Sequence, residues 1–398
     1  MTAARRRQPG EGSISQYQTK AGPRFLAKYS YTADDGTRKQ ALKRGFPTRK
    51  AAADYLRERV TSVQRGEHVA PNRVTVEEHF AAWLDGLRQQ PSTVASYRKN
   101  VRLHVVPHIG ALRLEQLTGT RLTKLYRHLE TAGRADGQGG LSPRTVRYVH
   151  TIVHAGLRAA VRDGLVLSNA ADKADPPSAK AAASPEMTFW TAPQLATFLR
   201  HDPQHELAMA WRLLANTGMR RGEALALRWS DVDWTAGRIS VQRAVGVVKT
   251  KGAGEELHFG KPKSGRARVV DLDPATLAAL RSYRAQRAEV ALTLAKDDAL
   301  VLGTIDGAVR HPERFSRAWQ TAVTRARRDL PDLPAIRLHD LRHTHATIML
   351  GAGIPVKVVS ERLGHANATI TLGVYAHVMP GMQAEAASLF ANLIAEEA

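Results

Sequence analysis

The sequence of 398 residues contains no cysteine and no long apolar run. The absence of cysteine excludes disulfide bridges and thiolate metal sites, and it fits a reducing compartment. No stretch approaches the ~20 apolar residues that a membrane-spanning helix needs. The basic N-terminus also lacks the apolar segment of a signal peptide. We therefore expect a cytoplasmic protein that makes no contact with membrane.

Acidic residues are scarce relative to basic ones, because 37 Asp and Glu stand against 58 Lys and Arg, for a formal net charge of +21. The excess runs through the whole chain, with a net of +9 in residues 1–70, +6 in residues 71–175 and +6 in residues 176–398. A protein that neutralises many phosphates has this composition. A basic surface that only maintains solubility is the alternative, and the dominance of arginine favours nucleic acid.

The N-terminal region alternates apolar and polar side chains around a hairpin signal at Asp35-Gly36, which predicts antiparallel strands. A helix is predicted to follow, with Thr48 as its N-cap and Gly66 at its end. This region is thus predicted to be a small sheet with one helix across it. It offers a basic ribbon for a DNA groove, or else it tethers the chain or contacts protein. The candidate DNA-binding residues on its strands are Lys28, Arg38, Lys39, Lys43 and Arg44.

Residues 74–168 show the apolar periodicity of four helices. The first is predicted to begin after Thr75, and the last after Ser142, with Pro143 in its first position. Basic side chains on the outside of such a bundle could hold a duplex, and a merely solvated basic face is the alternative. The candidate DNA-binding residues are Arg98, Lys99, Arg102, Arg121, Lys124, Arg144 and Arg147.

A stretch rich in proline, alanine and serine separates this bundle from the rest of the chain and predicts a linker. Beyond it, helical patterns are interrupted by strand patterns between residues 238 and 272. The predicted fold class is therefore mainly α with small β-sheets. A sheet-plus-helix domain, a four-helix domain and a mixed α+β, mostly helical domain are expected at residues 1–70, 71–173 and 188–398, with the linker at 174–187.

The segment NTGMRRGEALALRWSDVD predicts that one helix ends near Gly218 and that a second begins near Arg221. Arg220 stands at this junction, where its side chain can project into a cleft, and Glu223 is close enough to buttress it. An exposed capping arginine is the alternative. Farther on, Lys263 is predicted to lie on a hairpin between two strands, beside a tight turn in GKPKSGRARVVDL, where it either swings into a cleft or stays in solvent.

The segment RLHDLRHTHATIMLGAG places several basic groups at the front of a predicted helix. Asp340 is expected to cap that helix, and His339 and Arg342 share one face of it. His343 repeats the spacing of a zinc-binding helix, but Arg342 would repel a dication, and no nearby carboxylate or cysteine completes a ligand set. We therefore predict an anion site and no metal. His343 is expected to be structural, and His345 receives no role.

The next segment, LGHANATITLGVYAH, predicts a helix end at Gly364 followed by the ring of His365. Tyr375 follows ten residues later. A phenol has a pKa of about 10, so it attacks poorly unless cations or a base assist it. A tyrosine that only packs is the alternative for this residue alone.

The ordered set of these residues resembles the tyrosine recombinase family, the phage-type integrases. The matching stretches are TGMRRGEALALRWSDVD, KPKSGRARVV, HDLRHTHATIMLGAG and LGHANATITLGVYAH. The four-helix region is similar to the core-binding domain of that family, and the N-terminal region resembles the arm-binding domain of its larger members. One departure is Asp271, where the family often has proline. The catalytic set that the resemblance implies is Arg220, Lys263, His339, Arg342, His365 and Tyr375.

The resemblance also implies the chemistry. Tyr375 would attack a DNA phosphodiester, form a 3′-phosphotyrosine bond and free a 5′-hydroxyl, while Arg220 and Arg342 hold the non-bridging oxygens. Of the remaining groups, His339 would act as general acid/base, His365 would hydrogen-bond the phosphate, and Lys263 would protonate the departing oxygen. One phosphodiester replaces another, so no cofactor, metal or ATP is expected, and the sequence contains no GxxxxGK[ST] loop.

The expected function is therefore that of an integrase of a phage or mobile element, acting as a homotetramer on double-stranded attachment sites in a bacterial host cell. A host DNA-bending protein and an excisionase are possible partners. A resolvase or invertase of the same family and a type IB topoisomerase share the chemistry. A DNA-binding regulator without activity belongs to another class, and the six intact residue types argue against it. The apolar stripe of residues 381–398 predicts a tail helix that packs in cis or links protomers.

Overall fold

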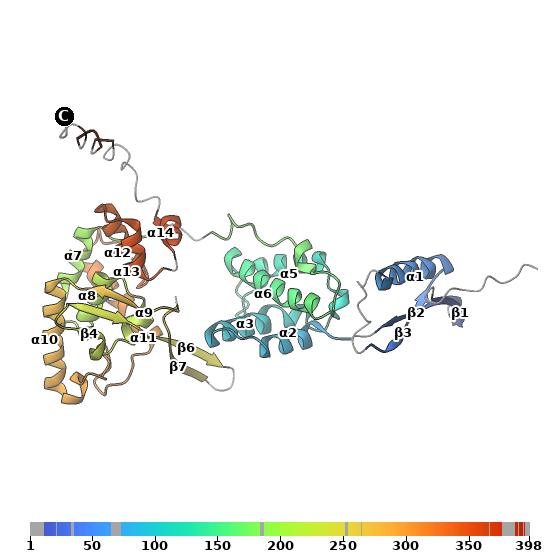
Figure 1. The fold of residues 1–398 in the computed structure, drawn as a ribbon, viewed down its shortest axis with the longest axis horizontal. Coiled ribbons are helices and arrows are strands. Elements are labelled where there is room, and N and C mark those ends of the chain that lie inside the picture. The colour runs from blue at the N-terminus through green and yellow to red at the C-terminus, as the bar shows by residue number, and fades with distance from the viewer. Residues whose placement is uncertain are drawn as a thin grey trace, which may run out of the picture. The chain divides into compact units, whose positions relative to one another are not determined.

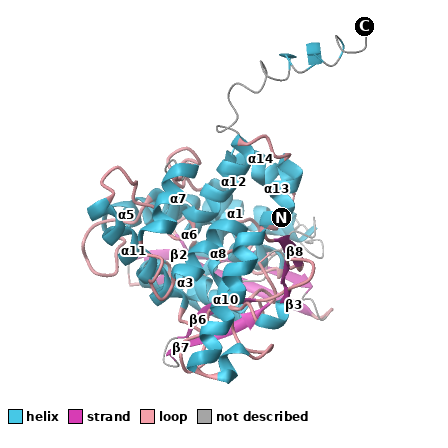
Figure 2. Cartoon of the chain, turned by 90° about the vertical axis from the view of Figure 1, so that its left-hand side faces the viewer, coloured by secondary structure: helices cyan, strands magenta, loops and turns pink. Residues whose placement is uncertain are grey.

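The computed structural model describes residues 12–20, 22–32, 36–64, 73–183, 187–250, 254–263, 265–365, 367–375, 387–388, 390–392 and 394. The chain folds into two compact units, Met1–Ser184 and Pro185–Ala398 (Figure 1). Helices dominate, and the strands are few and short beside them (Figure 2), which confirms the predicted fold class. Within the described residues, no helix is both long enough and apolar enough to cross a bilayer.

The first unit begins with a three-stranded antiparallel sheet in the order β1-β2-β3, covered by one helix, α1. The hydroxyl of Thr48 accepts a hydrogen bond from the backbone of Ala51 at 3.1 Å, so the predicted N-cap is confirmed. The predicted stop at Gly66 and the turn residue Asp35 lie outside the described residues. The bounds are β1 Ser13–Thr19, β2 Gly22–Thr32, β3 Arg38–Phe46 and α1 Arg49–Gln64.

The alternation of side chains along β3 divides the five candidate DNA-binding residues between the two faces of this sheet. Ala41 is buried beneath α1, so Lys39 and Lys43 lie on the helix side, where the Lys43 ammonium is 4.6 Å from the centroid of a tyrosine ring. The opposite face carries the exposed Leu42. Only three of the five candidates therefore share the open face, namely Lys28, Arg38 and Arg44.

A helical bundle completes the first unit, and the four predicted helices are all present with a short fifth one between them. Thr75 and Glu78 form a reciprocal capping box, and Ser142 caps the last helix, as predicted. Phe80 is fully buried and lies directly against Gly156. The bounds are α2 Val76–Asp85, α3 Pro91–His104, α4 Val106–Ile109, α5 Gly119–Ala132 and α6 Pro143–Arg162.

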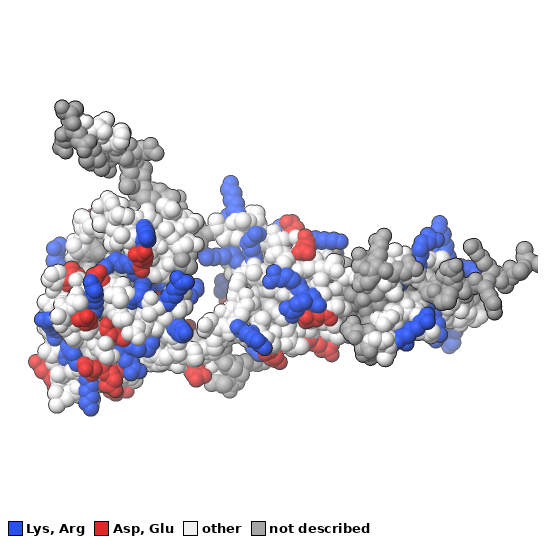
Figure 3. Space-filling view, viewed as in Figure 1, with Lys and Arg blue, Asp and Glu red and all other residues white. Residues whose placement is uncertain are grey.

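Six of the seven candidate DNA-binding side chains of the bundle are exposed. The exception is Arg147, which is half-buried because its guanidinium donates to the carbonyl oxygen of Pro177 at 2.8 Å. Arg98 is exposed but forms an ion pair with Asp85 at 2.6 Å. Figure 3 shows acidic side chains scattered among basic ones on the visible face of this unit. The basic surface is therefore interrupted rather than continuous.

In the described part of the second unit, the strands form two separate small sheets. Strands β4, β5 and β8 form one, and β6 pairs only with β7 among the described strands. The predicted hairpin at Lys263 is therefore wrong, because the strands on either side of it pair with different partners. The turn itself is present, since the Gly265 amide donates to the Pro262 carbonyl at 2.8 Å. The bounds are β4 Val232–Asp233, β5 Arg238–Val241, β6 Ala244–Thr250, β7 Gly254–Gly260 and β8 Arg268–Asp271.

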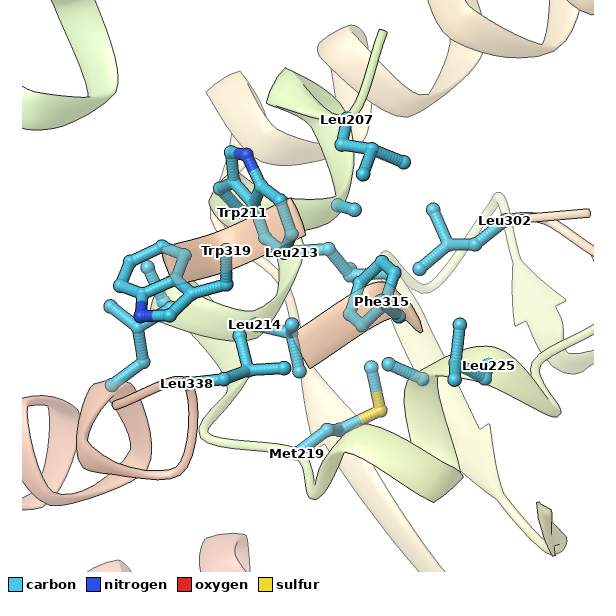
Figure 4. Close-up of a cluster of buried hydrophobic side chains, with 14 of the residues drawn as sticks. Leu207, Trp211, Leu213, Leu214, Met219, Leu225, Leu302, Phe315, Trp319 and Leu338 are labelled. Atoms are coloured by element: carbon cyan, nitrogen blue, oxygen red, sulfur yellow. The ribbon is translucent and has the colours of Figure 1, made fainter. Parts of the chain in front are cut away.

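An aromatic cluster joins the helices of the second unit (Figure 4). The ring centroid of Trp211 on α8 lies 5.2 Å from that of Trp319 and 4.9 Å from that of Phe315, both on α11. Met219 and Leu225 extend this cluster to α9. The bounds are α7 Ala192–His201, α8 Ala208–Thr217, α9 Arg221–Leu225, α10 Pro274–Val290, α11 Pro312–Asp329, α12 Asp340–Gly351, α13 Val356–Leu363 and α14 Ala368–Tyr375.

Candidate active site

Arg220 occupies the junction of two helices, as the sequence predicts. Gly218 ends α8 in the left-handed conformation, with φ of 63°, and α9 begins one residue after Arg220. Met219 is buried in the aromatic cluster, so the backbone before Arg220 is anchored. One oxygen of Glu223 accepts from the Arg220 backbone amide, and the other accepts from its Nη1, both at 2.9 Å. The predicted contact between Glu223 and Arg220 is confirmed.

Glu223 is 1% exposed and holds a second guanidinium, that of Arg268 on β8, at 2.7 Å. Burial by itself would raise the pKa of Glu223, but the hydrogen bonds from Arg268 and Arg220 outweigh it and lower that pKa. Arg268 was not among the residues predicted from the sequence. The sequence contains one indication of its position. Arg268 precedes the apolar Val270 by two residues on a short strand, so the two side chains lie on the same face of that strand, which faces the interior.

Arg342 lies on α12 and is 3% exposed. Its Nη1 donates to the carbonyl oxygen of Gly218 at 2.8 Å. Gly218 precedes Arg220 by two residues, so this hydrogen bond holds the Arg342 guanidinium close to the loop that carries Arg220. The prediction that Asp340 caps this helix is wrong. Asp340 is the first helical residue, and its carboxylate accepts from the backbone and the guanidinium of Arg337 instead. The N-cap position belongs to His339.

The ring of His339 is reached by solvent and lies perpendicular to that of His343, with 5.1 Å between their centroids. Partial loss of hydration lowers the pKa of His339 to about 4, and the neighbouring His343 and then Arg342 add to this effect. In the absence of a bound anion, this ring is therefore neutral at pH 7. A neutral imidazole has both a donor and an acceptor nitrogen.

His365 follows Gly364, which ends α13 with φ of 69°. Its Nδ1 is 2.8 Å from the hydroxyl oxygen of Thr371, and among the described residues no hydrogen bond engages its Nε2. Burial, followed by Arg342 and Arg220, lowers the pKa of His365 to about 4. The carbonyl oxygen of Gly364 is 3.5 Å from Nη2 of Arg220. The loop after α13 and the loop after α8 therefore meet at this point.

Tyr375 is the last residue of α14, and its side chain lies outside the part of the chain that is described. Its backbone follows that of Thr371 by four residues, which is about 6 Å along a helix. Residues four apart lie on one face of a helix. The backbone of Tyr375 is therefore about one helical turn from that of Thr371, the residue that contacts His365.

Lys263 lies exposed on the turn between β7 and β8. Within the described residues, no hydrogen bond or ion pair joins it to the other candidates. Arg220, Arg342 and His365 are thus brought together, and His339 occupies the N-cap position of α12, three residues before Arg342. Lys263 is not drawn into this group.

A second network behind these residues explains His345, which received no role from the sequence. Its Nδ1 donates to the carbonyl oxygen of Ala215 at 2.8 Å, and its Nε2 accepts from Nε of Arg362 at 3.1 Å. The other nitrogens of Arg362 donate to the carbonyl oxygens of Asn216 and Asp271. This arrangement requires a neutral His345 and ties α13 to both α8 and β8.

The chain is similar to several known proteins. Residues 186–381 match the phage integrase family, and residues 15–63 match an arm DNA-binding domain. The XerC-like tyrosine recombinase of Caldanaerobacter subterraneus is 23% identical and covers 87% of this chain and 90% of its own length. The ICEBs1 integrase of Bacillus subtilis is 24% identical and covers 77% and 79%.

The fold is also that of a solved integrase. The Tn1549 transposon integrase in complex with transposon right-end DNA superimposes with a TM-score of 0.63, at 20% identity, over 79% of this chain and 99% of that one. The family matches cover both the N-terminal sheet domain and the unit that carries the arginines and histidines. The chain therefore belongs to the phage integrase family and is a tyrosine-type site-specific DNA recombinase.

Proposed function

We propose that this chain is an integrase of a phage or other mobile element and that it exchanges DNA strands through a covalent link to Tyr375. The observation that carries the proposal is the meeting of Arg220, Arg342 and His365 at the loops after α8 and α13. Two guanidinium groups and a neutral imidazole form a site for one phosphodiester. Thr371 connects this site to the helix that ends with Tyr375.

In the proposed reaction, the phenolic oxygen of Tyr375 attacks the phosphorus atom, and the bond to the 5′-oxygen of the next nucleotide breaks. The phosphate becomes esterified to the tyrosine, and the 5′-hydroxyl is released. Arg220 and Arg342 stabilise the charge that accumulates on the non-bridging oxygens. Both are held by protein acceptors before DNA binds, so little reorganisation is needed in the transition state.

The remaining groups transfer protons or donate hydrogen bonds. His339 accepts the proton of the phenol, and neutral His365 donates a hydrogen bond to the phosphate from Nε2. Lys263 supplies the proton to the departing 5′-oxygen, which requires its exposed turn to move onto the DNA. The attack of the 5′-hydroxyl of the exchanged strand on the phosphotyrosine reverses these steps and reseals the backbone.

Four subunits are proposed to act together, because two duplexes contain four strands and each subunit supplies one Tyr375. The N-terminal sheet and the bundle provide further contacts to the attachment sites through their exposed arginines and lysines. A host DNA-bending protein and an excisionase are the accessory partners that we propose. The enzyme would act on DNA within a bacterial host cell.

The test is to trap the covalent intermediate on a nicked attachment-site duplex, from which the cleaved fragment diffuses away. The wild-type protein is expected to form an adduct that survives denaturation, and Tyr375→Phe is expected to form none. Tyr283→Phe is the matched control, since this tyrosine is in the same unit on α10, and it should cleave normally. An adduct with Tyr375→Phe would refute the assignment of the nucleophile. No adduct with the wild-type protein would favour a regulator without activity.

A further inference from the structure

The guanidinium of Arg268 has no part in the proposed reaction, yet it lies behind the candidate active site. Its side chain is 8% exposed on β8. A buried cation is costly unless it is paired and hydrogen-bonded. What Arg268 contacts therefore indicates why a cation is present there.

Arg268 contacts two parts of the site with two different nitrogens. Its Nη2 donates to Oε2 of Glu223 at 2.7 Å, and the other oxygen of that carboxylate accepts from Arg220. Its Nε donates to the carbonyl oxygen of Arg362 at 2.8 Å. Arg362 is in the last turn of α13, and His365 follows three residues later. One planar group thus connects the carboxylate that holds Arg220 with the helix end that carries His365.

The end of α13 is shaped around this guanidinium. A Cβ atom on Gly364 would lie 2.8 Å from Cδ and 2.9 Å from Nη1 of Arg268, so only glycine fits against it. Gly364 also has φ of 69°, which few other residues adopt. The unsatisfied carbonyls of a helix C-terminus attract cations. The backbone turn from α13 into His365 therefore rests on Arg268.

We propose that Arg268 is a positioning residue that sets the separation of Arg220 and His365, and that strand cleavage depends on it although it does not touch DNA. This inference rests on the proposed function of those two residues. Arg220 and His365 come from loops more than 140 residues apart in the sequence. Through Glu223 and the Arg362 carbonyl, Arg268 links both loops to one strand.

A second arginine of the same unit provides a matched control. Arg243 donates to both oxygens of Asp231 at 2.6 Å, and Asp231 is 6% exposed. This pair resembles that of Arg268 and Glu223 in its chemistry and in its buried carboxylate, although the Arg243 side chain is 32% exposed and that of Arg268 is 8% exposed. It has no hydrogen bond to a candidate site residue among the described ones. Arg243→Lys therefore reports the effect of weakening an ion pair to a buried carboxylate when no site residue is attached to that pair.

The experiment compares Arg268→Lys with Arg243→Lys in the full-length protein. An ammonium keeps the charge but cannot donate in the two fixed directions of a guanidinium. We expect Arg268→Lys to bind attachment-site DNA like the wild type and to form the covalent adduct roughly 100-fold more slowly in single turnover, because a displacement of about 1 Å suffices for that loss. Arg243→Lys should cleave at the wild-type rate, although it too should lower the thermal midpoint.

A double-mutant cycle with Arg220→Ala separates positioning from general destabilisation. If Arg268 acts through Arg220, Arg268→Lys should cost about tenfold or less in the Arg220→Ala background, because only its effect on His365 remains. A loss of equal size in both backgrounds, a parallel loss of DNA affinity, or a cleavage rate within twofold of wild type would each overturn the proposal.

Arg268→Gln is the second variant if Arg268→Lys does not fold, and the same cycle is then made with it. Unfolding of both variants would identify Arg268 as a purely structural residue and would also overturn the proposal. The wild-type adduct is measured in every series. Its absence would refute the proposed function, whereas its presence with unaffected Arg268 variants would refute only this inference.

Discussion

At the scale of the residue, the site is built from groups whose charge is set by their neighbours. Glu223 is ionised because two guanidinium groups hold it, and His345 is neutral because its two nitrogens face a carbonyl and an arginine. Burial, then Arg362, lowers the pKa of His345 to about 4, far below the value in an unfolded chain. The protonation of this ring is therefore coupled to folding.

We predict that the stability of the fold depends on pH through His345. Between pH 6.5 and 4 the unfolded chain binds a proton at His345 and the folded chain does not, so stability falls as the pH is lowered through this window. His345→Asn keeps a donor for the Ala215 carbonyl but cannot titrate. From pH 7 to pH 5, chemical denaturation should show that the wild type loses about 2 kcal/mol more than the variant does. Parallel losses would show that His345 does not titrate on unfolding.

At the scale of the element, a glycine that ends one helix also contacts the helices packed beside it. Gly218 ends α8 with a positive φ, its carbonyl oxygen accepts from Arg342, and a Cβ placed on it would lie 2.7 Å from Leu363 and 2.8 Å from His345. The close approach of α8 to α12 and α13 therefore depends on this one residue. Gly237 has the same backbone conformation, with φ of 64°, but more space around it.

We predict that Gly218→Ala is more harmful than Gly237→Ala. Both variants should lose about 1–2 kcal/mol from the left-handed conformation, because their φ angles are nearly equal. Gly218→Ala should lose about 1–3 kcal/mol more from overpacking, and its cleavage rate should fall because the acceptor of Arg342 moves. Denaturant unfolding and adduct formation are the measurements. Equal stabilities for the two variants would show that α8 and α13 can separate without cost.

At the scale of the whole molecule, the net charge of +21 does not tell which basic residues contact DNA and which only add to the overall positive charge. The N-terminal sheet makes this distinction possible, because its open face carries Lys28, Arg38 and Arg44 while α1 covers the other face. The exposed surface of α1 offers an equal number of cations for comparison, namely Arg49, Lys50 and Arg57.

The corresponding prediction concerns the salt dependence of DNA binding. Replacing the three open-face residues with alanine should reduce the slope of log K against log salt by up to about 3, since each lost phosphate contact contributes about 0.9. Alanine at the three α1 positions removes the same charge and should change the slope much less. Titration of attachment-region DNA at several salt concentrations tests this. Equal changes for the two variants would mean that only bulk charge matters.

Much of the site could be predicted because local sequence determines helix ends. Thr75 and Ser142 begin helices through hydrogen bonds to their own neighbours, and Gly218 and Gly364 end helices because a positive φ suits glycine. Such contacts span three or four residues, so a sequence displays them. The junction position of Arg220 and its contact with Glu223 followed for the same reason.

One error was local, because the carboxylate of Asp340 accepts from Arg337 three residues earlier and does not cap the helix. The other two arose where partners are distant in the chain. The hairpin at Lys263 was wrong because β8 pairs with β5, some thirty residues earlier, rather than with β7. Arg268 was missed because its partners, Glu223 and the carbonyl of Arg362, lie far away on both sides in sequence. Strand pairing and the inward face of a strand depend on tertiary packing.

The sequence by itself determined the family, the order of the chemical groups and the ends of the helices, because these depend on residue identity and on contacts within a turn. Only the tertiary structure decided which cations face one another, which ones hold the others in place and which remain in solvent. The physical reason is that burial and pairing set the cost of a charge, and both are properties of the packed chain.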